Sequence, residues 1–136
     1  MDTPAGWRDD GDCYDTHAKA IVFGDARVPE GAVLCHGWPV LRRPPYNRYG
    51  HCWLEYEVEI PIDAEGNTAS ITYVRDFANG LDVNMPARLY YTYGQIHEDR
   101  IARYDSEEAR IMLLTHEHWG PWVEYDELDP MGDNQE

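Results

Sequence analysis

Three residues of the sequence, Cys13, His51 and Asp76, carry the side chains that catalysis by a thiol nucleophile requires. A cysteine attacks a carbonyl group as the thiolate, and a neighbouring histidine generates this thiolate by taking up the proton. A carboxylate can then hold the imidazole ring in place and stabilise its protonated form. The three residues therefore form a candidate catalytic triad, provided that the elements of the fold bring them together.

The first of these elements is a helix predicted at about 13–23, with Asp12 as its N-cap. Cys13 would open this helix, where the helix dipole favours a thiolate and the Cys13 N–H could donate to an oxyanion. Acidic residues ahead of the helix act in the opposite sense, because they raise the pKa of the thiol. His17 lies one turn after Cys13 on the same face of the helix, so it could touch the site, but we expect it to be exposed to solvent.

The second element is a β-hairpin that carries His51 and Asp76. Residues 51–60 alternate between apolar and charged side chains, which is typical of a half-buried strand, and 70–76 form the return strand. The expected inward side chains are Cys52, Leu54, Tyr56, Val58 and Ile60, and the expected outward ones are Glu55, Glu57 and Glu59.

The turn at 63–67 determines which residues of the hairpin face each other. With the turn centred near residue 65, paired residues have numbers that sum to about 130. The residue numbers of His51 and Asp76 sum to 127, so we expect these residues nearly opposite each other and within side-chain reach. Asn79 is the alternative third group if the register shifts.

The remaining segments indicate the fold class. A short strand is predicted at 32–35, a helix at 85–94 with Asn84 as its cap, a strand at 101–104 and a helix at 106–116. Helices and short strands in this order predict an α+β fold, with a small antiparallel sheet packed against helices. Residues 1–123 are expected to form a single domain, followed by an acidic, disordered tail at 124–136.

The charge and composition exclude several classes of protein. The 136 residues include 26 acidic and 11 basic side chains, for a net charge of −15, which argues against direct binding to nucleic acid. No apolar run is long enough to span a membrane, and no signal peptide is visible at the N-terminus. The three cysteines are an odd number, without the density of a disulfide scaffold, so we expect a cytoplasmic protein.

Three segments also carry a family resemblance: DCYDTHAKA around Cys13, GHCWLE around His51 and YVRDFANG around Asp76. In this order they resemble the transglutaminase-like and papain-like cysteine enzymes, and in particular small bacterial and phage proteins with a Cys, HAW and Asp pattern. The resemblance covers roughly residues 12–96. It implies a papain/transglutaminase-like core with a cysteine on an N-terminal helix, and acyl transfer from a protein, peptide or small amide or ester without a cofactor.

The loop that leads into His51 is basic. Arg42, Arg43 and Arg48 lie in this loop, which contains no acidic residue. Arginine side chains bind carboxylates and phosphates through paired hydrogen bonds. We therefore expect the loop to border the site and to bind an anionic group of the substrate.

Other interpretations of the same residues remain open. A non-catalytic acidic protein could bind a basic protein partner, as a phage-type anti-defence inhibitor or a nucleic-acid mimic, and its surface charge favours this alternative. A zinc site would have to combine separate pairs, Cys13 with His17 and Cys35 with His36, so no metal is expected. Cys35 and Cys52 fit better as buried core residues than as nucleophiles.

Overall fold

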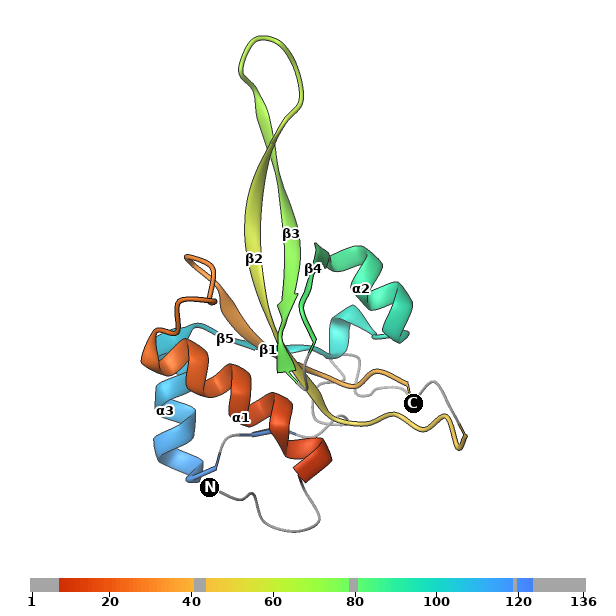
Figure 1. Ribbon diagram of the computed structural model, residues 1–136, viewed down its shortest axis with the longest axis vertical. Coiled ribbons are helices and arrows are strands. Elements are labelled where there is room, and N and C mark those ends of the chain that lie inside the picture. Colours follow the sequence, from red (N-terminus) through yellow and green to blue (C-terminus); the bar gives the residue numbers. More distant parts are fainter. Residues whose placement is uncertain (1–7, 41–43, 79–80, 119, 124–136) are drawn as a thin grey trace.

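The structure of the chain is a computed structural model that describes residues 8–40, 44–78, 81–118 and 120–123, with side chains described from Thr16 onward. Within these ranges the elements follow in the order α1 (Arg8–Phe23), β1 (Val33–Gly37), β2 (His51–Pro61), β3 (Thr68–Asp76), β4 (Val83–Pro86), α2 (Ala87–Gly94), the 3₁₀ turn η2 (Glu98–Arg100), β5 (Ala102–Tyr104) and α3 (Ser106–His116). The strands form an antiparallel sheet in the order β4-β3-β2-β1-β5 (Figure 1). The α+β class expected from the sequence is confirmed. The predicted tail at 124–136 lies outside the described residues.

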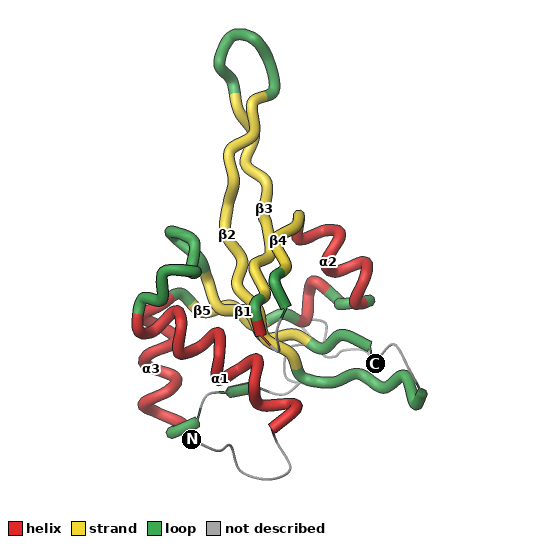
Figure 2. Tube along the Cα trace, viewed as in Figure 1, coloured by secondary structure: helices red, strands yellow, loops and turns green. Residues whose placement is uncertain are grey.

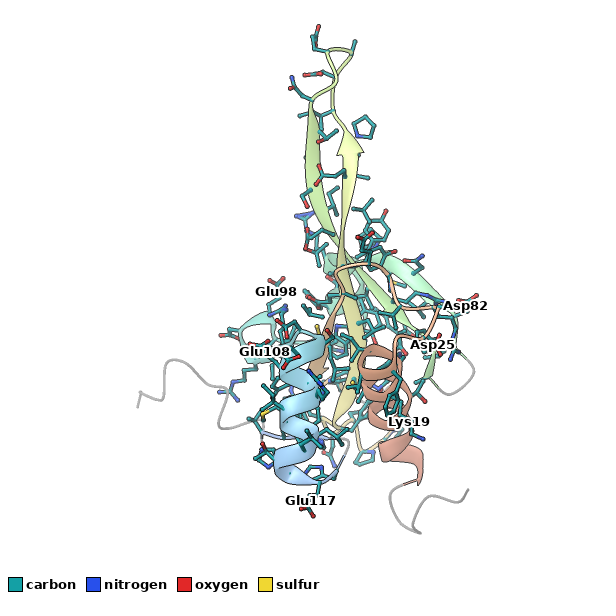
Figure 3. All side chains as sticks on the ribbon, turned by 90° about the vertical axis from the view of Figure 1, so that its left-hand side faces the viewer. Lys19, Asp25, Asp82, Glu98, Glu108 and Glu117 are labelled. Atoms are coloured by element: carbon teal, nitrogen blue, oxygen red, sulfur yellow. The ribbon has the colours of Figure 1, made fainter. Side chains whose placement is uncertain are left out.

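The helices cover the sheet from two sides. α1 and α3 pack side by side on one face, and α2 lies on the other (Figures 1 and 3). The core under α1 and α3 contains Ala18, Ile21, Leu34, Cys52, Leu54 and Ala109. The core under α2 contains Cys35, Trp53, Val74, Tyr91 and Ile96. Because helices pack against both faces, successive residues at the start of β2 are all buried.

The hairpin of β2 and β3 is longer than the sheet that supports it. Its register runs from Leu54 opposite Arg75 to Pro61 opposite Thr68, so paired residues sum to 129, in agreement with the expectation from the turn. β1 pairs with β2 only as far as Glu55, and β4 pairs with β3 only from Tyr73 onward. We call 51–55 and 73–76 the base of the hairpin. We call 56–72 the arm, which projects from the body of the molecule (Figure 2).

The first helix is longer than predicted. α1 includes Arg8 and continues to Phe23, so Cys13 lies in its second turn and Asp12 is inside the helix instead of being its N-cap. The prediction was wrong because Asp12 was taken as the N-cap, although an aspartate also fits within the first turns of a helix. The acidic residues in the first turns also interact favourably with the helix dipole.

Two other local expectations were wrong. Glu55 was expected to face solvent, but it is only 4% exposed, because α2 covers this face of the base and Trp53, Tyr91 and Arg103 bond to its carboxylate. Asn84 lies inside β4, and Pro86 occupies the N-cap position of α2. α3 begins as predicted at Ser106, and a capping box between Asp105 and Glu108 stabilises its start.

Among the helices of the described ranges, none combines the length and the apolar character needed to cross a bilayer. Figure 3 shows the charged side chains of Lys19, Glu108 and Glu117 on the outer sides of α1 and α3.

Candidate functional site

His51 and Asp76 meet at the end of the sheet, where β2 begins and β3 finishes. The observed register places them two residues away from direct pairing, on the same face of the hairpin. The Nε2 atom of His51 lies 2.9 Å from Oδ2 of Asp76. Both residues are largely shielded from solvent, with 8% of His51 and 1% of Asp76 exposed.

Asp76 accepts further hydrogen bonds that keep it ionised. The hydroxyl of Tyr90 donates to Oδ2 at 2.7 Å, and the backbone N–H of Ala78 donates to Oδ1 at 3.2 Å. Burial by itself raises the pKa of Asp76. The hydrogen bond and charge of His51, with smaller contributions from His17 and Tyr90, outweigh burial and lower this pKa below its usual value.

The ionised Asp76 determines how the His51 ring can act. A carboxylate only accepts hydrogen bonds, so the ring nitrogen that faces it, Nε2, carries a proton. The other ring nitrogen, Nδ1, is therefore the one that can take up or release a proton during a reaction. The negative charge of Asp76 stabilises the ring when both nitrogens are protonated.

His17, for which solvent exposure was expected over contact with the site, belongs to this cluster. It is fully buried, its Nε2 accepts a hydrogen bond from the Phe77 N–H at 3.1 Å, and the same atom lies 3.5 Å from Oδ1 of Asp76. The expectation was wrong because α1 crosses the end of β3. The apolar stripe of Ala18 and Ile21 already pointed to this face of the helix, so the signal was present in the sequence.

Cys13 lies in the second turn of α1, one helical turn before His17, and its side chain lies outside the described residues. A residue at this position bonds its backbone N–H to the carbonyl four residues earlier. The expectation that the Cys13 N–H contributes to an oxyanion hole is therefore wrong. The helix dipole also acts mainly in the first turn, so its support for a thiolate at Cys13 is reduced.

The other two cysteines lie in the core, as expected. Cys35 and Cys52 are both 0% exposed. Burial raises the pKa of the Cys35 thiol well above its usual value, and the nearby Glu55 carboxylate adds to this increase. A buried thiol of this kind is chemically inert in the folded protein.

The arginines of the loop before His51 are only partly described. Arg48 donates through Nη1 to the carbonyl oxygens of Trp38 at 2.7 Å and Gln95 at 2.8 Å, and its Nη2 lies 3.2 Å from Nε2 of His97. These contacts tie the loop to the end of α2. Arg42 and Arg43 lie outside the described residues, as does Asn79, the alternative third group.

A pocket of about 440 Å³ opens beside His51 and Asp76, on the α2 side of the sheet. Its walls come from the loop before His51, from β4 and from α2. In the described part of the chain, no cluster of three or more histidine, cysteine or acidic side chains could hold a metal ion.

No family model matches the chain, and no curated protein or solved structure is significantly similar to it. The fold and the site together define an α+β protein with a buried His–Asp pair beside a pocket.

Proposed function

We propose that the protein is a cysteine-dependent acyl-transfer enzyme in which Cys13 is the nucleophile, His51 the acid and base, and Asp76 the residue that orients His51. The observation that carries this proposal is the His51–Asp76 hydrogen bond of 2.9 Å beside a pocket, with Asp76 ionised. A papain/transglutaminase-like core, which the resemblance implies, and a cytoplasmic setting belong to the same proposal.

The position of α1 supports Cys13 as the nucleophile. His17 lies 3.5 Å from Asp76, and Cys13 precedes it by four residues, which corresponds to about 6 Å along the helix axis. Cys13 therefore lies on the same helix as His17, which contacts the His–Asp pair through Asp76. Because Cys13 is not at the helix start, activation of its thiol would depend chiefly on His51.

Cys13 and His51 can carry out the reaction by covalent attack and proton transfer, with water or an amine as the second substrate. Nδ1 of His51 takes the thiol proton, and the thiolate attacks the carbonyl carbon of an amide or ester to form a C–S bond. Collapse of this intermediate breaks the bond to the leaving amine or alcohol, which receives the proton from His51. Water then releases a carboxylic acid in a hydrolase or deamidase, whereas an amine acceptor forms a new amide in a transglutaminase.

The experiment is alkylation of the folded protein with iodoacetamide over a pH series, with each modified cysteine read by mass spectrometry. Cys13 should react faster than Cys35 and Cys52, which serve as internal controls. His51→Ala should raise the pKa of the Cys13 thiol and slow its labelling at neutral pH. Asp76→Asn should have a smaller effect in the same direction, because it acts through the ring.

The matched control is His116→Ala, which removes an exposed histidine from the last turn of α3. It should leave the labelling rate of Cys13 unchanged. Labelling of Cys35 or Cys52 ahead of Cys13 contradicts the proposal, and so does an unchanged Cys13 rate in His51→Ala.

A second candidate is a non-catalytic protein that binds a basic partner. The observation that favours it is the arm, whose residues 56–72 include four acidic and no basic side chains: Glu57, Glu59, Asp63 and Glu65. The position of Cys13 inside α1 also favours this candidate. The alkylation experiment separates the two, because a binding protein needs no cysteine of unusual reactivity.

A further inference from the structure

The pocket beside His51 has an apolar lining. Its aliphatic walls are formed by Pro39, Val40, Leu81, Val83, Met85 and Ile96. Three tyrosines, Tyr49, Tyr90 and Tyr93, complete them. No lysine or arginine is among the described residues that line the pocket, and Asp76 is the only acidic one. A volume of about 440 Å³ falls within the usual range of sites for small molecules.

The pocket is held open by backbone contacts between its walls. The N–H of Val40 donates to the carbonyl of Gly94 at 3.0 Å, which joins the loop to the end of α2. A Cβ atom added at Gly94 would meet Ile96 at 3.1 Å and Pro39 at 3.2 Å, so glycine permits this close approach. Arg48 reinforces the same junction through the carbonyls of Trp38 and Gln95. A preformed pocket loses little conformational freedom when a ligand binds.

The described lining of the pocket is unfavourable for charged groups. An anion would lie close to the ionised Asp76, and the described lining offers it no basic side chain. A cation would lose its hydration, while Asp76 already accepts hydrogen bonds from His51, Tyr90 and Ala78.

The rim of the pocket exposes apolar surface that a ligand would cover. Tyr93 is 63% exposed and Leu81 is 45% exposed. They come from different segments and both line the opening, so one apolar group seated in the pocket would bury part of each. Burial of such surface is the main favourable contribution to binding of an apolar group.

We infer that this pocket binds the uncharged, aliphatic or aromatic side of the acyl group that the protein transfers, with the reacting carbonyl next to His51. The inference rests on the proposed function for the reaction, whereas the binding of an apolar amide in the pocket does not depend on it. It replaces the anionic substrate group expected from Arg42, Arg43 and Arg48 with a neutral one.

The experiment is an NMR titration of ¹⁵N-labelled Cys13→Ala protein, which prevents turnover, with three primary amides. Hydrocinnamamide ends in a phenyl group, succinamic acid in a carboxylate and 4-aminobutanamide in an ammonium group. Hydrocinnamamide should shift the amide signals of Gly50 and Gly94, which line the pocket. It should bind about tenfold more tightly, or better, than either charged amide, as burial of a phenyl-sized group implies.

A pair of variants locates the binding. Leu81→Asp places a carboxylate at the rim and should weaken hydrocinnamamide by about tenfold. Leu89→Asp makes the same change at a residue that is 57% exposed and lines a different groove, and it should have no effect.

The inference is overturned if no amide binds, if either charged amide binds as tightly as hydrocinnamamide, or if the signals of Gly50 and Gly94 do not move. It is also overturned if Leu89→Asp weakens binding as much as Leu81→Asp. If Cys13 proves unreactive while hydrocinnamamide still binds in the pocket, the proposed function fails and the ligand class stands.

Discussion

The base and the arm of the hairpin belong to the same two strands and share one register, but the base contains buried residues and the arm contains none. In the base, β2 is buried at every residue from His51 to Glu55, because α1 and α3 cover one face and α2 the other. In the arm, β2 alternates between half-buried and exposed residues, and β3 is exposed from Thr68 to Ile71. Alternation in a sequence therefore identifies a strand, but the helices that pack on it decide which residues are buried.

The acidic side chains show what this difference means for energetics. Glu55 and Asp76 in the base are surrounded by donors: Glu55 accepts hydrogen bonds from Trp53 and Tyr91 and pairs with Arg103 at 3.0 Å. Glu57 in the arm accepts from Ser70 and Thr72 but remains exposed to water. Loss of a buried carboxylate leaves its hydrogen-bond donors unpaired inside the protein, which costs free energy. The donors that face an exposed carboxylate can bond to water instead.

The largest effect is expected from the core of the base. Trp53 is fully buried against Tyr90 and the α2 core, so Trp53→Ala should reduce the free energy of unfolding by about 3–5 kcal/mol. The matched change in the arm is Ile62→Ala, where the side chain is 61% exposed and the loss should stay within about 0.5 kcal/mol. Urea unfolding followed by circular dichroism measures both. Similar losses in the two variants would show that the arm is packed in solution.

An intermediate effect is expected for the pH dependence of stability. The pKa of Asp76 is lowered in the folded protein, so its ionised form stabilises the fold above the unfolded pKa of about 4. This contribution disappears as the pH falls through the folded pKa. The free energy of unfolding of the wild type should therefore fall steeply below about pH 4. Asp76→Asn should be less stable at pH 7, and its free energy of unfolding should fall less steeply as the pH is lowered.

Glu57→Gln is the control in the arm for this pH dependence. Hydrogen bonds from Thr72 and Ser70 lower the pKa of Glu57, so the sign is the same as for Asp76. Its exposure to solvent makes the effect small. Urea midpoints measured between about pH 2.5 and 7 compare the two variants across the titration range of carboxyl groups. If the stability of Asp76→Asn fell as steeply at acidic pH as that of the wild type, the ionised Asp76 would not stabilise the fold.

The same contrast explains how much the sequence could predict. The strands of the hairpin, their register and the meeting of His51 with Asp76 follow from local patterns, because a turn and an alternating strand fix the pairing. β4 was missed, because Asn84 and Pro86 fitted the start of a helix. The burial of Glu55 depends on Arg103 in β5, a segment distant in the sequence, and no local pattern contains that information. The burial of His17 could have been inferred from the apolar stripe of Ala18 and Ile21, but its contact with Phe77 after β3 could not. The length of α1 was missed because Asp12 was taken as its N-cap, whereas the helix begins at Arg8.

The smallest effect is expected from removal of most of the arm. Residues 59–70 can be replaced by Asn-Gly, so that Val58 and Ile71 flank a two-residue turn. The N–H of Ile62 donates to the carbonyl of Asn67, so these two residues form a hydrogen-bonded pair. Such pairs alternate with non-hydrogen-bonded ones along an antiparallel hairpin, so Val58 and Ile71 also form a hydrogen-bonded pair. A two-residue turn connects a pair of this kind. Because the base retains its contacts with α1, α2 and α3, the shortened protein should unfold within about 1 kcal/mol of the wild type.

This shortened variant also separates the two candidate functions. The rate of Cys13 alkylation and the binding of hydrocinnamamide should be unchanged, since no residue of the arm lines the pocket beside His51. The removed segment contains Glu59, Asp63 and Glu65, three of the four acidic residues of the arm. If the variant lost Cys13 reactivity while remaining folded, the arm would be part of the site, and the division of the hairpin into a functional base and an independent arm would be wrong.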